Sequence, residues 1–332
     1  MGMMSEASSQ PRFFDARGNI YAVIAPAALA RFGLPETAEA AARTHETWAH
    51  AVVEALCGWP EGPPAGAKPY RSDGLLIGPF QSAPPFDLLI LNTDGTLAER
   101  SGNGLTIFAT AQAEDGLLPP AMPVTLRVHH AGTTPSPAAV TVARGQDGAE
   151  SGIWLELGQP VFGPEAVAAR PGCVIPCAES PAFTILRLAV LNPRWQRTVF
   201  VRIGNPHAVT FLAEEALLPS MADLRAPALH AALTRIAFAS GSQGEGDPCL
   251  AGINLQWAAL RPDGSLAARI FERGEGPTDS SGTSATAVAG AARRLGLVTG
   301  PRVLVHMPGG TAPIDFSEDG TVRLFGTARP LP

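Results

Sequence analysis

The stretch between positions 269 and 294 constrains the fold most, because it reads as a strand, a glycine-rich turn and a helix in succession. The run Ser281-Gly282-Thr283-Ser284-Ala285 opens an alanine-rich segment that we expect to be helical until Gly296 ends it. Such a helix start presents unpaired N–H groups at the positive end of the helix dipole, where a carboxylate or phosphate binds. Glu272 and Arg273, just before the turn, can bind the ammonium and carboxylate of one small zwitterion. A capped helix without any ligand explains the same residues.

A similar order of elements occurs in both halves of the chain. In each half a strand leads to a Gly-Asn pair, at positions 18–19 and 204–205, and a later Ser-Gly turn opens a helix, at Ser101 and Ser281. This repeated order predicts an internal duplication with two helix N-termini, and duplicated folds commonly place their site between the halves. Chance similarity between two glycine-rich turns is the alternative.

The composition favours a globular protein that acts on a small molecule. The chain has 332 residues, 45% of them hydrophobic, which is enough for two domains. Its formal net charge is −6 and no basic run is interleaved with aromatic residues, so neither nucleic acid nor an anionic membrane is an expected partner. No apolar segment is long enough to span a bilayer, and the first ten residues lack a signal-peptide pattern, so we expect a cytoplasmic protein.

The sequence suggests neither a metal site nor lysine Schiff-base chemistry. Its four cysteines are too few and too scattered for a disulfide framework, and Cys173 and Cys177 lack two further ligands at suitable spacing for zinc. Adjacent His129 and His130 at a strand end would direct their rings to opposite sides. The sole lysine, Lys68, lies in a proline-rich loop and is a poor candidate for Schiff-base chemistry.

Several short motifs follow one another along the chain. They are Gly18-Asn19, Asp73-Gly74-Leu75-Leu76, Asn92-Thr93-Asp94-Gly95, Ser101-Gly102-Asn103-Gly104, Gly204-Asn205-Pro206-His207, Asn254, Glu272-Arg273-Gly274, Thr278 with Ser281-Gly282-Thr283, and Pro308-Gly309-Gly310. Each motif alone is weak, but in their order and spacing they resemble the motifs of the diaminopimelate epimerase family, from about Phe13 to Gly326.

The resemblance implies an α/β fold of two pseudo-symmetric domains. Each would be a curved, mostly antiparallel sheet wrapped around a central helix, with the site in the interdomain cleft. The expected domains are residues 12–137 and 138–319, joined by the Thr/Pro/Ser-rich stretch 133–138, and segment 320–332 can pack back onto the first domain. The implied activity is that of a cofactor-independent isomerase, of racemase or epimerase type, acting by proton transfer on a small amino acid or dicarboxylic acid similar to diaminopimelate. The family also makes a homodimer an expectation.

In the family, one cysteine removes the α-proton as a thiolate and a second cysteine protonates the opposite face, each at a helix N-terminus. Ser101 and Ser281 occupy the two cysteine positions here. The resemblance assigns the reacting carboxylate to backbone N–H groups of Gly102, Asn103, Gly282 and Thr283. It assigns the substrate's amino and other carboxylate groups to Asn19, Asn92, Asn205, Asn254, Glu272 and Arg273.

A serine hydroxyl is a far weaker acid than a thiol, so the two-thiol mechanism does not carry over unless a neighbouring group takes the proton. Three hypotheses remain open. The first is an isomerase, epimerase or lyase of this fold with a different acid–base set, for which His207 and Asp279 are further catalytic candidates. The second is an epimerase in which Ser101 and Ser281 themselves exchange the proton. The third is a catalytically silent binding protein that kept the pocket.

The additional candidates also have purely structural interpretations. His207 follows Asn-Pro and can bond the backbone of its own turn, and Asp279 can cap the following helix. The turn around Asp279 is loosely similar to one in the phenazine-biosynthesis isomerases, which share the fold and use carboxylates. Glu272 and Arg273 can form a plain ion pair on a strand.

Overall fold

The computed structural model describes residues 10–64, 67–120, 122–131 and 135–332, which form two compact units. Unit 1 extends to Glu156 and includes the final segment Phe325–Pro332, whereas unit 2 comprises Leu157–Leu324. Both units combine a mixed sheet with helices, so the α/β class expected from the sequence is confirmed. In the described part of the chain, no helix is long and apolar enough to cross a membrane.

Unit 1 is built on one mixed sheet whose strands pair in the order β19, β1, β2, β3, β4, β5, β6, β7. The pairs β2–β3 and β4–β5 are parallel and the others are antiparallel. The strands are β1 (Arg12–Ala16), β2 (Asn19–Ile24), β3 (Gly74–Ile77), β4 (Phe86–Asn92), β5 (Val124–Val128), β6 (Ala138–Asp147), β7 (Glu150–Gly158) and β19 (Arg329–Pro330).

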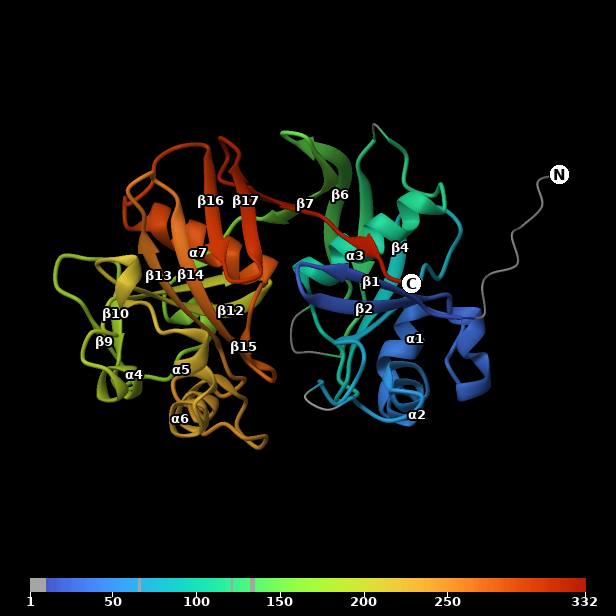
Figure 1. Cartoon of the computed structure of the whole chain (residues 1–332), viewed down its shortest axis with the longest axis horizontal. Helices are drawn as coiled ribbons and strands as arrows, with labels where there is room; N and C mark the ends of the chain where they lie inside the picture. The colour runs from blue at the N-terminus through green and yellow to red at the C-terminus, as the bar shows by residue number, and fades with distance from the viewer. Residues whose placement is uncertain (1–9, 65–66, 121, 132–134) are drawn as a thin grey trace. The chain divides into compact units, whose positions relative to one another are not determined.

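Helices cover both faces of this sheet (Figure 1). On one face lies α3 (Gly102–Glu114), where Gly104 approaches Leu76 of β3. On the other face, α1 (Ala38–Arg43), α2 (His45–Cys57) and the 3-10 helix Pro26–Phe32 bury a core that includes Trp48 and Leu75. Because both faces are covered, every residue of β3 is buried, which explains its continuous apolar sequence.

The boundary between the units falls later than the position 137/138 expected from composition. β6 continues the unit 1 sheet by pairing with β5, from Val128 opposite Ala138 to Val124 opposite Val142. The final segment also lies in unit 1, where the rings of Phe325 and Trp154 are 5.2 Å apart and β19 pairs with β1. The expected linker therefore coincides with the connection inside the β5–β6 hairpin; its residues 133 and 134 lie outside the described residues.

Unit 2 has a second mixed sheet, which curves around α7 (Gly282–Arg294) (Figure 1). Its strands pair in the order β9, β10, β11, β12, β13, β14, β16, β17, β18, with β12–β13 and β14–β16 parallel. Short β8 adds to β11 and short β15 to β14. The strands are β8 (Val161–Phe162), β9 (Val174–Pro176), β10 (Phe183–Ile185), β11 (Thr198–Ile203), β12 (Asn205–Phe211), β13 (Asn254–Leu260), β14 (Leu266–Glu272), β15 (Gly276–Thr278), β16 (Arg302–Met307), β17 (Gly310–Phe316) and β18 (Val322–Gly326).

The helices of unit 2 pack against its sheet with side chains of different size. α7 is buried from Gly282 to Ala292, and its small side chains let several strands approach it closely. α5 (Met221–Arg225) and α6 (Pro227–Ala237) pack against a larger core that includes Trp257 and Phe271. The smaller elements are α4 (Leu186–Leu191) and the 3-10 helices Glu165–Val167 and Glu215–Leu217.

Candidate functional site

Ser281 is the N-cap of α7, as its place in the sequence predicts. Its Oγ accepts a hydrogen bond from Ser284 N at 3.4 Å, and its carbonyl accepts the first intrahelical bond, from Ala285 N at 2.9 Å. The N–H groups of Gly282 and Thr283 precede that first bond and have no acceptor within the helix. They lie at the positive end of the dipole, so this helix start can bind an anion.

The Ser281 hydroxyl is also bonded to a carboxylate. Ser281 Oγ donates to Glu272 Oε1 at 2.8 Å, and Thr278 Oγ1 donates to Glu272 Oε2 at 2.9 Å. The contact forms because β15 folds back on β14, with Gly276 opposite Glu272, through a turn in which Gly274 has a φ of 83°. A hydroxyl bonded to a carboxylate can pass its proton to that carboxylate while it accepts another.

Arg273 brings three of the sequence-predicted binding residues together. Its backbone N donates to Asn254 Oδ1 at 2.8 Å, and its Nη2 lies 3.5 Å from Asn205 Oδ1. Its Nη1 donates to the carbonyl of Ala251 at 3.0 Å. Asn205 and Asn254 are the first residues of the adjacent strands β12 and β13, which explains why they meet beside the end of β14.

His207 lies beneath this site and is fully buried. Its Nδ1 is 3.0 Å from Gln256 Nε2, which also donates to Ser284 Oγ at 3.1 Å, so His207 bonds a side chain rather than the backbone of its own turn. Burial, with smaller contributions from the positive charges of Arg273 and Arg202, lowers the pKa of His207 to about 3. The imidazole is therefore neutral at physiological pH.

Asp279 lies at the edge of the site. Its Oδ1 is 3.3 Å from Arg225 Nη2, and half of its side chain is exposed. Ser281 rather than Asp279 caps α7. The structure therefore supports neither the capping interpretation of Asp279 nor a contact between its side chain and Ser281.

In unit 1, Ser101 caps α3 and accepts a hydrogen bond from Gly104 N at 3.1 Å. Gly102 and Asn103 form the first turn of that helix. Asn92 donates to Thr96 Oγ1 at 3.0 Å, and Asn19 begins β2 in a buried position. Within the described residues of unit 1, the Ser101 hydroxyl has no carboxylate acceptor.

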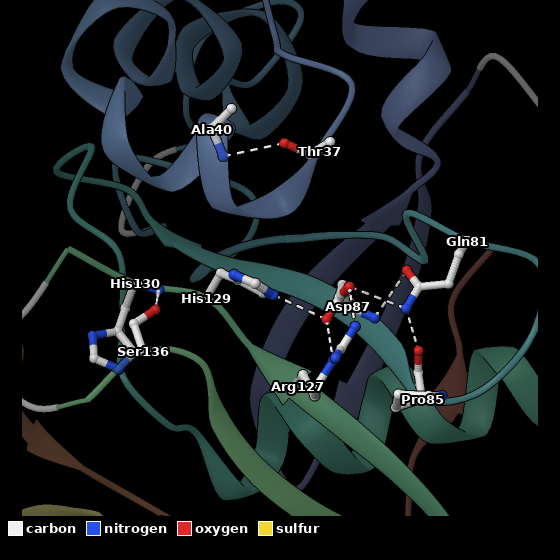
Figure 2. A network of polar contacts seen from close by, with 9 residues as sticks. All are labelled: Thr37, Ala40, Gln81, Pro85, Asp87, Arg127, His129, His130 and Ser136. Atoms are coloured by element: carbon white, nitrogen blue, oxygen red, sulfur yellow. Dashed lines mark hydrogen bonds and ion pairs between the residues drawn. The ribbon is translucent and has the colours of Figure 1, made fainter.

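Unit 1 also contains a polar cluster around Asp87, which the sequence analysis did not predict as a cluster (Figure 2). Arg127 of β5 binds both carboxylate oxygens of Asp87 of β4, at 2.6 and 2.7 Å, and His129 Nε2 lies 2.9 Å from Asp87 Oδ1. Burial raises the pKa of Asp87, but the hydrogen bonds from Arg127 and His129 outweigh burial and leave the pKa lowered. Of its members, only His129 was named from the sequence, as one of two adjacent histidines. The other signal was one charged residue in each of two mainly apolar strands, Asp87 in β4 and Arg127 in β5.

The two adjacent histidines of this cluster point in different directions. Figure 2 shows the His129 ring directed at Asp87 and the His130 ring directed away from it. The His130 backbone N donates to Ser136 Oγ at 3.0 Å. No group of three or more potential metal ligands occurs in the portion of the chain that the structure describes.

Comparison with known proteins places the chain among isomerases. The family model described as diaminopimelate epimerase matches residues 199–330. A diaminopimelate epimerase of Erythrobacter litoralis is 30% identical over 255 residues, covering 76% of this chain and 77% of that protein. One from Geobacillus kaustophilus is 28% identical over 270 residues, covering 77% and 79%.

Solved structures share the fold at low sequence identity. A hydroxyproline epimerase from Agrobacterium vitis has a TM-score of 0.58 and 15% identity, covering 97% of this chain and 89% of that chain. A PhzF-family phenazine biosynthesis protein from Bacillus anthracis has a TM-score of 0.55 and 12% identity, covering 97% and 96%. With the two helix starts, the motif order and the relatives in agreement, the chain belongs to the diaminopimelate epimerase family.

Proposed function

We propose that this protein is a cofactor-independent isomerase that moves a proton at the α-carbon of a small amino acid or dicarboxylic acid, with Ser281 and Glu272 as its acid–base pair. The 2.8 Å hydrogen bond from Ser281 Oγ to Glu272 Oε1 carries the proposal. Membership in a family of epimerases supports the reaction class, and the acceptor carboxylate supplies what a serine lacks in place of a thiol.

The proton transfer balances within this pair. As the substrate C–H bond breaks, Ser281 Oγ takes the α-proton while its own hydroxyl proton moves to Glu272 Oε1. Glu272 becomes a neutral acid, and the single negative charge moves onto the substrate, where it delocalises into the reacting carboxylate. Reversal of the two transfers returns a proton to the same face of the carbon, which exchanges the hydrogen without inverting the centre. Inversion requires a proton delivered to the opposite face, for which Ser101 is the candidate. No free alkoxide forms at Ser281, because its hydroxyl proton passes to Glu272 as the α-proton arrives.

The surrounding groups stabilise that charge. The N–H groups of Gly282 and Thr283 and the dipole of α7 would bind the reacting carboxylate as it gains charge. Arg273, held by Asn254 and Asn205, would bind a second carboxylate of the substrate. Ser101 remains the candidate for the second proton transfer, with Asn19, Asn92, Gly102 and Asn103 as candidate binding residues.

His207 and Asp279 take other roles in this proposal. A histidine whose pKa is about 3 is already neutral at physiological pH and is a weak base. Asp279 is engaged with Arg225. We therefore assign proton transfer to Glu272 and Ser281 in preference to these two residues.

The test is exchange of the α-hydrogen in deuterated water. The protein would be incubated with a panel of amino acids and dicarboxylic acids, diaminopimelate included, and the α-hydrogen signal followed by proton NMR. Ser281→Ala should abolish the exchange, whereas Ser280→Ala, which removes a neighbouring buried hydroxyl, should retain it. Ligand line-broadening without any exchange would instead identify a silent binding protein and refute the proposed activity.

A further inference from the structure

A cavity of about 440 Å³ lies at the C-terminal end of α3, far along the helix from Ser101. Every residue that lines it belongs to unit 1, so its shape does not depend on unit 2. The thirteen residues of α3 span about 20 Å, which separates the cavity from the helix start. Its volume lies within the range of small-molecule sites. Its polar wall comes from Thr110 and Glu114 of α3 and from Arg144, Gln146 and Ser151 of the β6–β7 hairpin.

Packing of the hairpin explains why polar side chains face this cavity. Gly145 and Gly152 are paired across β6 and β7. A Cβ on Gly152 would lie 2.4 Å from the carbonyl oxygen of Gly326, and one on Gly145 would lie 2.5 Å from the ring of Trp154. That face of the hairpin is therefore closely packed. Because side chains alternate along a strand, Arg144 and its neighbours emerge on the opposite face, which lines the cavity.

The hairpin side of the cavity has unused hydrogen-bonding groups. Among the described residues, the side chains of Arg144, Gln146 and Ser151 make no hydrogen bond or ion pair with one another or with any other group. Gln146 lies two residues beyond Arg144 along β6, and Ser151 of β7 is directly opposite Gln146. A planar guanidinium with open donors, beside an amide and a hydroxyl, matches a carboxylate.

The helix side of the cavity has the opposite electrostatic character. Glu114 is the last residue of α3, where the helix dipole is negative, so this end attracts a cation and repels an anion. Arg12 approaches Glu114 only to 3.5 Å, whereas it contacts Asp115 at 2.7 Å. The Glu114 carboxylate is partly exposed and able to accept a further ammonium group.

We propose that this cavity is a second binding site, which takes a small amino acid in its zwitterionic form. The carboxylate binds Arg144 with Gln146 and Ser151, and the ammonium lies toward Glu114 and the end of α3. The site is separate from Ser281 and holds whether or not Ser281 transfers protons.

Ligand titrations observed by NMR test the proposal, with the amides of Gly145 and Gly152 as local reporters. Glycine and L-lysine are the zwitterionic probes. Acetate carries the carboxylate alone, and n-butylamine carries the ammonium alone. The zwitterions should shift both reporter amides saturably and more strongly than either half-probe. Arg144→Ala should raise the dissociation constant at least about tenfold, the effect of losing one charge-assisted pair. Arg43→Ala, which removes the same charge from an exposed position on α1, should leave it unchanged.

Three results would overturn the proposal. The first is the absence of any saturable shift up to roughly 20 mM probe, where a site with a 1 mM dissociation constant is nearly full. The second is binding that survives Arg144→Ala unchanged. The third is a dimer in light scattering that dissociates in the Arg144→Ala variant, which would make the cavity a contact between two copies.

Discussion

Helices α3 and α7 begin alike but differ in what surrounds their first residue. Each has 13 residues and a serine N-cap, and each has a threonine in its second turn that donates to the carbonyl of its first glycine, Thr106 to Gly102 and Thr286 to Gly282, both at 2.9 Å. Ser281 also donates to Glu272, whereas the described residues of unit 1 provide Ser101 with no carboxylate.

The contrast between the two helix starts distinguishes groups that can bind an anion from groups that can transfer a proton. Both helix starts have the N–H groups and the dipole that bind an anion. At α7, β15 folds back on β14 and so brings the helix start beside the Glu272 carboxylate, whereas no described residue of unit 1 provides Ser101 with a carboxylate. The shared features are consistent with the proposed internal duplication. Under the proposed function, the added carboxylate assigns removal of the α-proton to Ser281 rather than to Ser101.

The largest expected effect is that of Glu272→Gln. The amide oxygen can still accept the Ser281 hydrogen bond, but glutamine cannot take the proton, so the rate of α-hydrogen exchange should fall about 10²–10⁴-fold. Substrate dissociation constants, measured by calorimetry, should change much less. Exchange at the wild-type rate in this variant would remove the distinction between the two helix starts.

Acid should destabilise the protein through His207, which is buried beneath the α7 site. The pKa of His207 is about 3 in the folded protein, so between pH 6.5 and 3 the unfolded chain binds a proton that the folded chain does not. Stability from this group is complete above pH 6.5 and falls with decreasing pH, by about 2 kcal/mol at pH 5. Urea unfolding at pH 7.5 and pH 5 should show this loss in the wild type and in His50→Gln, an exposed control, but not in His207→Gln. An equal loss of unfolding free energy in His207→Gln would show that His207 does not cause the acid sensitivity.

Local signals in the sequence were sufficient for both helix starts. A serine before a Gly-Thr or Gly-Asn run predicts an N-cap, and the structure confirms the cap at Ser101 and at Ser281. These features depend on residues within a few positions of one another, where local physical preferences act strongly.

Contacts that depend on register could not be predicted in the same way. Glu272 and Ser281 were both named from the sequence, but their bond requires β15 to fold back on β14. Asp87 and Arg127 are 40 positions apart and meet only through the parallel pairing of β4 and β5. The unit boundary was placed too early because a proline-rich connection in a hairpin has the same composition as an interdomain linker.

In unit 1, the Asp87 cluster should also lose stability in acid, as His207 does in unit 2. Because the folded pKa of Asp87 is lowered, its contribution to stability is present above the ordinary carboxyl range and is lost as pH falls through the folded pKa. Asp87→Asn should destabilise the protein by about 1–2 kcal/mol at pH 7, since it weakens charge-assisted bonds to Arg127 and His129. The difference from wild type should shrink below pH 4 in urea unfolding. A difference that stays constant down to pH 3 would show that the charge of Asp87 is not involved.

The smallest expected difference is between the two serine caps themselves. Ser101→Ala and Ser281→Ala each remove a side-chain acceptor from a helix start, which costs about 1 kcal/mol of unfolding free energy. Ser281→Ala also deprives Glu272 Oε1 of its hydroxyl donor, so it should destabilise the protein more than Ser101→Ala does.

The double variant Ser281→Ala/Glu272→Gln should lose less unfolding free energy than the sum of the two single losses, because the two residues share one hydrogen bond. Thermal and urea unfolding of the four variants measure this coupling. Additive costs would mean that the hydroxyl and the carboxylate do not act as a unit, and the contrast between α3 and α7 would then have no energetic basis.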